Sequence, residues 1–194
     1  MIHTTNEDLM CRVTAGDKHA FEALVHRHQR PVLNFVFRFL GDRAEAEDLT
    51  QEVFLRVWKS AKTYKPDAKF TTWLYRISIN LCINRQKTLR MRRWFSVPEP
   101  PEQKQSSEEA FYPTEGSETA TAESHLINSE QSRRLLNALN ALPTSQRIAI
   151  VLKIYDGLSY QEISQLMNRS ASAVDSLLIR AKKNLRKKLA KMNF

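Results

Sequence analysis

Apolar side chains recur with the period of an α-helix along nearly the whole of this 194-residue chain. Phe21, Leu24 and His28 fall at positions i, i+3 and i+7, which places them on one helical face, and similar spacing follows in later segments. The chain has only four glycines and few runs in which β-branched and polar residues alternate, so strand signals are weak. We therefore predict an all-α fold.

Positive charge is concentrated towards the two ends of the chain. Residues 1–95 hold 17 basic and 10 acidic side chains, residues 96–130 hold one and eight, and residues 131–194 hold 12 and three. The middle segment is rich in Pro, Glu, Ser and Thr, and it has too few large apolar residues to offset the entropy lost on ordering. We predict two small helical domains, at 1–95 and 131–194, joined by a flexible acidic linker at 96–130.

The overall balance of charge favours a polyanionic partner. The formal charge of +9 points first to nucleic acid and second to an anionic membrane surface. We find no basic segment followed by an apolar signal region and no apolar run long enough for membrane insertion, so we expect a cytoplasmic protein. Cys11 and Cys82 stand far apart, which suggests neither a disulfide framework nor a zinc site.

Residues 69–94 combine seven Lys or Arg side chains with aromatic rings and contain no Asp or Glu. On a helix that starts near Thr71 or Thr72, apolar side chains would pack inward and a polar stripe would face solvent. A stripe without carboxylates attracts phosphates, Asn and Arg can hydrogen-bond base edges, and aromatic rings can stack on unpaired bases. Alternatively, the rings are ordinary core and the basic residues an ordinary solvated face.

A short helix, a tight turn and a longer basic helix follow one another near the C-terminus. Ser159 and Glu162 have the spacing of a capping box, and "NRS" at 168–170 forms the turn. This order predicts a helix-turn-helix, whose second helix enters the DNA major groove with its N-terminus first. The alternative is a plain antiparallel pair of helices with a solvated basic tail.

Three motifs in this order resemble a known family. They are "DLTQEVFLRVWKSAKTY", "FTTWLYRISINLCINR" and "LPTSQRIAIVLKIYDGLSYQEISQLMNRSASAVDSLLIRAKKNL". In these three motifs the chain resembles the extracytoplasmic function (ECF) group of bacterial RNA polymerase sigma factors. The resemblance implies a first domain, region 2, that binds core polymerase and melts the minus-ten promoter element. It implies a second domain, region 4, that reads the minus-35 element and contacts the beta flap. It also suggests an anti-sigma factor as a partner.

The resemblance assigns residues to each of these surfaces. Those matching the helix that grips the beta-prime coiled coil are Asp48, Gln51, Glu52, Phe54 and Arg56. Those matching the minus-ten reader are Tyr64, Lys69, Phe70, Trp73, Arg76, Asn80, Asn84 and Lys87. In the helix-turn-helix, we expect base-edge contacts from Ser170, Ser172, Ala173, Asp175 and Ser176. We expect mainly phosphate contacts from Lys182, Lys183, Arg186 and Lys187, and we include Arg180 in the same minus-35 surface.

Two features depart from the family or point elsewhere. Asp175 stands where many members carry a basic residue, and a carboxylate there repels phosphate but can accept a hydrogen bond from cytosine N4. The acidic cluster around Glu45 suits the first turn of a helix better than a metal site. We expect no enzyme activity, no cofactor and no metal. The rival interpretation is a helix-turn-helix regulator that binds duplex DNA without polymerase.

Overall fold

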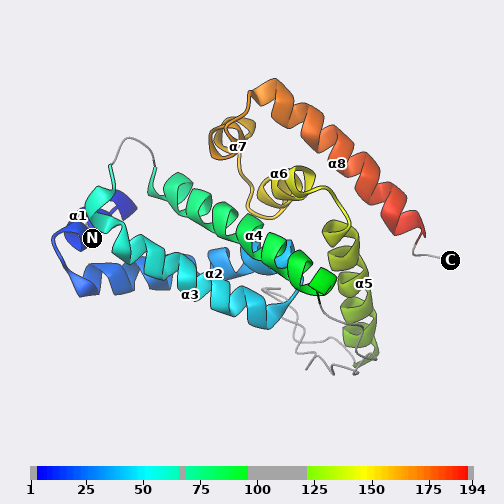
Figure 1. The fold of residues 1–194 in the computed structure, drawn as a ribbon, viewed down its shortest axis with the longest axis horizontal. Helices are drawn as coiled ribbons and strands as arrows, with labels where there is room; N and C mark the ends of the chain where they lie inside the picture. The colour runs from blue at the N-terminus through cyan, green and yellow to red at the C-terminus, as the bar shows by residue number, and fades with distance from the viewer. Residues whose placement is uncertain (1–3, 66–68, 96–121, 192–194) are drawn as a thin grey trace.

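The computed structural model describes residues 4–65, 69–95 and 122–191 and is helical almost throughout (Figure 1). No strand occurs in these ranges, and the all-α prediction is confirmed. In chain order the elements are α1 (Asn6–Thr14), α2 (Lys18–Leu40), α3 (Arg43–Lys59), the 3-10 turn η1 (Ala61–Thr63), α4 (Phe70–Phe95), α5 (Ala122–Asn140), α6 (Thr144–Ile154), α7 (Tyr160–Met167) and α8 (Ala171–Lys191).

The first half of the chain packs α1, α3 and α4 against α2. Asp17 and Asp42 start α2 and α3, because each aspartate side chain accepts a hydrogen bond from a backbone N–H in the first helical turn. α2 runs through Pro31 and ends at Gly41, whose φ of +76° belongs to the left-handed region that glycine adopts without strain. The Asp42 cap therefore fixes where α3, the helix with the predicted polymerase surface, begins.

The second half contains the predicted helix-turn-helix. The Ser159 hydroxyl accepts from the backbone N–H of Glu162, and the Glu162 carboxylate accepts from the backbone N–H of Ser159, so the predicted capping box starts α7. Asn168 ends α7 in the left-handed conformation with φ of 50°, and α8 follows. α6 packs along both α7 and α8. Helix α6 therefore holds the two helices of the helix-turn-helix in place.

The predicted linker differs from the structure at its C-terminal end. Residues 96–121 lie outside the described residues, but residues 122–130, which we placed in the flexible linker, belong to α5. Acidic composition suggested an extended chain there, whereas Ala, Glu, Leu and Ile at 122–130 are compatible with helix. Helix α5 therefore begins within the range predicted to be linker.

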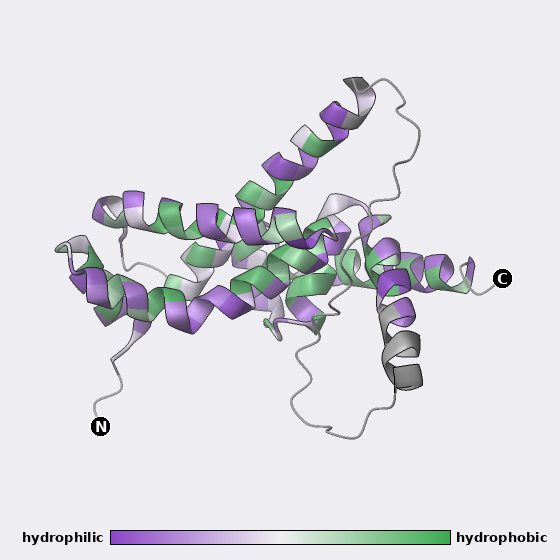
Figure 2. Ribbon diagram, turned by 90° about the horizontal axis from the view of Figure 1, so that it is seen from below, coloured by the Kyte–Doolittle hydropathy of each residue, from purple (hydrophilic) through white to green (hydrophobic). Residues whose placement is uncertain are grey.

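Buried side chains of both halves join in one hydrophobic core. α2 contacts α5 and α6, and α4 contacts α7, so segments far apart in the sequence lie side by side (Figure 1). Many of the ribbon segments coloured as hydrophobic lie towards the middle of the molecule, where the helices meet (Figure 2). We call the zone in which α5, α6 and α7 meet α2 and α4 the seam.

Candidate nucleic-acid and polymerase interface

α4 presents the predicted polar stripe to solvent. Its members, Arg76, Asn80, Asn84 and Lys87, are all exposed. They recur at helical spacing, while Leu74, Leu81 and Cys82 on the other side are buried in the core. The stripe is therefore a continuous polar surface that contains no carboxylate of its own.

Aromatic rings gather at the N-terminal end of α4. The Tyr64 ring lies 5.0 Å from that of Trp73 and 6.4 Å from that of Phe70, measured between centroids. The Glu7 carboxylate accepts a 2.8 Å hydrogen bond from the Phe70 backbone N–H, which fixes the start of the helix. Burial raises the pKa of the Tyr64 hydroxyl, which has no hydrogen-bond partner within the described residues.

One member of this cluster, Phe70, cannot serve as the stacking residue that we predicted. Phe70 is fully buried, so its ring cannot stack on a base without opening the core. It was predicted from its ring and its position, but the first residue of α4 points inward between Tyr64, Trp73 and His28. Tyr64 and Trp73 are half-buried and keep some of their surface, and Lys69 is exposed. Residues 66–68 of the preceding loop lie outside the described residues.

α3 carries the residues predicted to bind polymerase. Asp48, Gln51 and Arg56 are exposed, and Glu52 is half-buried. Phe54 is only 6% exposed and packs in the core, so it cannot offer its ring to a partner and that assignment is wrong. The neighbouring Leu55 is 57% exposed and supplies the apolar surface that Phe54 was expected to give. The sequence argument missed Leu55, although Val53 and Val57 on either side already indicated which face is buried.

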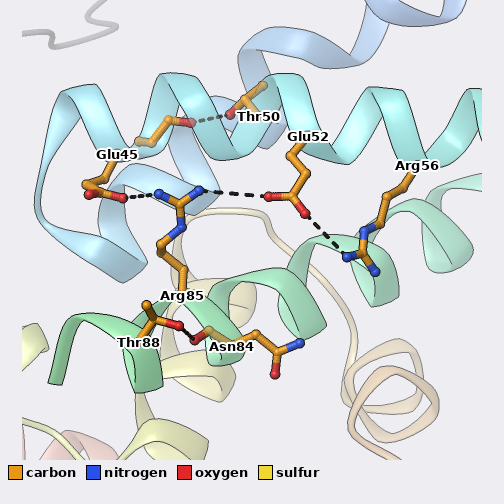
Figure 3. A network of polar contacts seen from close by, with 8 residues as sticks. Glu45, Thr50, Glu52, Arg56, Asn84, Arg85 and Thr88 are labelled. Carbon is orange, nitrogen blue, oxygen red and sulfur yellow. Dashed lines mark hydrogen bonds and ion pairs between the residues drawn. The ribbon is translucent and has the colours of Figure 1, made fainter. Parts of the chain in front are cut away.

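Arg85 connects this face of α3 to α4 (Figure 3). Its guanidinium donates a 2.6 Å hydrogen bond to Glu45 and lies 3.8 Å from the Glu52 carboxylate. Glu52 in turn lies 3.3 Å from Arg56 on its own helix. Glu52 is therefore held between two arginines, and Arg85, which the sequence argument did not single out, sets the position of a predicted polymerase contact.

The recognition helix displays its predicted residues. Seven of them are exposed, namely Ser170, Ser172, Asp175, Ser176, Arg180, Lys183 and Lys187, whereas Ala173 is half-buried. The Ser170 hydroxyl accepts from the Ala173 backbone N–H and so caps α8, which leaves it less free to contact a base. Val174, Leu178 and Ala181 are buried against the rest of the second half. The basic side of α8 thus faces away from the core.

No group of three or more His, Cys, Asp or Glu side chains within the described residues is arranged to hold a metal ion. In the same ranges, none of the helices has the length and apolar character needed to cross a membrane.

Comparisons with known proteins agree with this geometry. Residues 24–94 match the family model Sigma-70 region 2, and residues 132–185 match Sigma-70, region 4. The RNA polymerase sigma-H factor of Pseudomonas aeruginosa is 32% identical over 188 residues, which cover 95% of this chain and 93% of that protein. The ECF RNA polymerase sigma-E factor of Haemophilus influenzae is 31% identical, with 95% of each chain covered. The chain belongs to the sigma-70 family, in its ECF group.

A solved structure agrees with this sigma-70 assignment at the level of the fold. The sigma factor RpoE in complex with the anti-sigma factor NepR from Bartonella quintana superposes with a TM-score of 0.62 at 20% identity, covering 88% of this chain and 96% of that one. The region 2 match ends within α4 and includes its polar stripe, and the region 4 match includes α7 and α8 up to residue 185. The resemblance inferred from the three motifs is confirmed.

Proposed function

We propose that this ECF sigma factor binds core RNA polymerase and directs promoter-specific initiation, with α4 reading the melted minus-ten element and α7–α8 reading the minus-35 duplex. The observation that carries the proposal is the exposed, carboxylate-free stripe on α4. A helix-turn-helix regulator acting without polymerase would use α8 in the same way, but it would leave this stripe without a role.

The minus-ten site combines two kinds of side chain. Lys69, Arg76 and Lys87 attract phosphates, and Asn80 and Asn84 can hydrogen-bond base edges. Tyr64 and Trp73 lie at the same end of α4 as Lys69 and offer partly exposed rings to an unpaired base. Stacking of a base on a protein ring contributes about 1–3 kcal/mol, which offsets part of the cost of unstacking the duplex. The site therefore suits single-stranded better than paired DNA.

The minus-35 site uses the start of α8 for bases and its later turns for phosphates. Ser172, Asp175 and Ser176 lie in the first two turns, where a recognition helix enters the major groove. Asp175 favours a cytosine, whose exocyclic amine can donate to a carboxylate. Arg180, Lys183 and Lys187 supply charge along the backbone, so we expect binding to weaken steeply with salt.

The polymerase site lies on α3. Asp48, Gln51, Glu52 and Arg56 give a largely acidic, hydrogen-bonding surface around the exposed Leu55, which suits a basic helical partner such as the beta-prime coiled coil. We propose contact of the second half with the beta flap on the family resemblance alone. We also propose a cytoplasmic location and an anti-sigma factor as a partner, supported by the related RpoE, solved with the anti-sigma factor NepR.

Binding to forked promoter DNA tests this function against its rival. The forked probe carries a duplex minus-35 element and a single-stranded minus-ten element, and the control probe is fully duplex. The proposal predicts tight binding of the forked probe only when the chain and core polymerase are both present. Equal binding of the chain to both probes, unaffected by polymerase, would identify the duplex-binding regulator instead.

A further inference from the structure

α7 covers part of the minus-ten surface of its own chain. Glu162 of α7 lies 3.4 Å from the Lys69 ammonium, and the backbone carbonyl of Gln165 accepts a 3.2 Å hydrogen bond from Arg76. Both cations belong to the surface proposed to hold minus-ten DNA. In this structure they are already engaged by the first helix of the helix-turn-helix.

The two contacts on α7 are too exposed to hold the halves together by themselves. The Lys69 side chain is 73% exposed, and exposed ion pairs of this kind contribute about 0–1 kcal/mol. A stronger connection is needed if α7 is to stay on α4. The structure contains such a connection between α6 and α2.

Arg147 of α6 supplies that connection. The residue is 2% exposed. Its guanidinium donates to the backbone carbonyl of Phe39 at 2.5 Å, and to the side-chain and backbone oxygens of Asn140, each at 2.8 Å. It also stacks over the Phe39 ring at 4.9 Å. Phe39 lies in the last turn of α2 and Asn140 ends α5, so the negative ends of two helix dipoles meet at one cation.

Further close contacts across the seam surround Arg147. A Cβ at Gly41 would lie 2.1 Å from the Asn140 side chain, so any other residue at this position would displace the side chain that accepts from Arg147. Arg38 of α2 stacks on the Tyr155 ring at 4.3 Å. Thr144 donates a 3.0 Å hydrogen bond to Gln86 of α4. The second half therefore contacts α2 and α4 through specific polar bonds as well as apolar packing.

We propose that this chain inhibits itself: Arg147 latches the second half onto α2, and α7 then competes with minus-ten DNA for Lys69 and Arg76. The inference rests on the proposed function of α4. The unlatched form is the one that binds DNA, so the apparent affinity is the intrinsic affinity multiplied by the fraction of chains that are unlatched. Any partner that separates α7 from α4 would activate the chain.

Carbodiimide crosslinking detects the closed form in the unmodified full-length chain. The reagent joins an amine to a carboxylate that it touches, and the Lys69–Glu162 pair fits this requirement. We expect mass spectrometry to find the two peptides joined in the free chain, and the product to disappear when a random-sequence single-stranded DNA oligonucleotide is added to saturation. A mixture of isotope-labelled and unlabelled chains shows whether the link forms within one molecule. No such link, or a link unaffected by bound DNA, would overturn the proposal.

Arg147→Met tests the latch directly. The variant loses a positive charge, which by itself lowers DNA affinity, so a gain cannot come from charge. We expect it to bind the labelled oligonucleotide about fivefold more tightly than the wild type. The matched control is Arg134→Met, which removes the same charge from an exposed i,i+4 pair with Glu130 on α5. Folding of each variant is checked by circular dichroism.

Glu162→Gln keeps the proposal testable if Arg147→Met does not fold. Glutamine also serves in a capping box, so α7 is retained while the Lys69 pair is lost. Its control, Glu130→Gln, removes the same charge from α5. Tighter oligonucleotide binding by Glu162→Gln than by its control supports self-inhibition, and equal binding contradicts it. If instead no variant binds forked promoter DNA with core polymerase, the proposed function fails, while the crosslink still reports whether the seam is closed.

Discussion

Arg85 of α4 donates a 2.6 Å hydrogen bond to Glu45 of α3, and this pair joins the helix proposed to read DNA to the helix proposed to bind polymerase. Both side chains are about three-quarters buried, with 28% and 24% of their surfaces exposed. This short, charged contact therefore holds the two helices together at one point.

Replacing Arg85 by Met should destabilise the chain by about 1–2 kcal/mol, because the partly buried Glu45 carboxylate loses its charged donor. Urea unfolding measures the change. Arg56→Met is the comparison, because its pair with Glu52 is more exposed and should contribute under about 0.5 kcal/mol. Equal effects of the two substitutions would show that Arg85 is an ordinary surface residue.

Asn80→Ala should impair promoter opening and leave polymerase binding unchanged. Asn80 is exposed in the middle of the stripe, so its removal takes away a base contact of about 1–3 kcal/mol without disturbing the core. Permanganate footprinting of the minus-ten element measures opening, and Thr88→Ala, further along α4, serves as the control. If Asn80→Ala lost opening and polymerase affinity in parallel, a folding defect would be the better explanation.

Asp156 should make the seam sensitive to pH. It faces Tyr75 of α4 and Arg38 of α2, and burial raises its pKa to about 6 from the ordinary value of 3.8, despite the opposing effects of those two neighbours. Once exposed, the carboxyl regains its ordinary pKa, so the folded, closed form binds the extra proton. Closure is therefore strongest below about pH 4 and is weakened as the pH rises through 6.

Asp156→Asn isolates this effect, because the amide imitates the protonated acid. We expect the variant to be more stable than the wild type at neutral pH, by up to about 3 kcal/mol, and the difference to vanish as the pH falls to about 4. Thermal unfolding of both proteins across this range gives the difference, in which the other carboxyl groups cancel. A difference independent of pH would exclude Asp156 as the titrating group.

Ser159→Ala should loosen α7 specifically. The substitution removes the hydroxyl that accepts from the Glu162 N–H, at a cost of about 1 kcal/mol. Hydrogen exchange should become faster in α7 and remain unchanged in α3. Ser159→Asp is a suitable control because aspartate also caps helices, and it should restore the protection that alanine removes.

Local signals in the sequence were sufficient for the helices and for much of the exposed site. Ser159 and Glu162 predicted the start of α7, and the spacing of Arg76, Asn80 and Asn84 predicted a solvent-facing stripe. These features depend on neighbours within one or two turns of helix. They therefore survive whatever the rest of the chain does.

The errors concern features that depend on distant contacts. Phe54 and Phe70 were assigned to partner surfaces by motif, but each helix buries a wider face than a single stripe of apolar residues suggests. Arg147 lies in the apolar run "QRIAIVLKI", and nothing near it in sequence indicates that its hydrogen-bond partner is Phe39. A basic residue surrounded by buried neighbours on one short helix is the signal that could have found it.

Run-off transcription with core RNA polymerase is the most direct test of the central claim. Reactions on a promoter library are compared with and without the chain, and the transcripts are sequenced. We predict transcripts that depend on the chain and that share a minus-35 and a minus-ten element. Binding of duplex DNA with no chain-dependent transcript from any promoter would contradict the account.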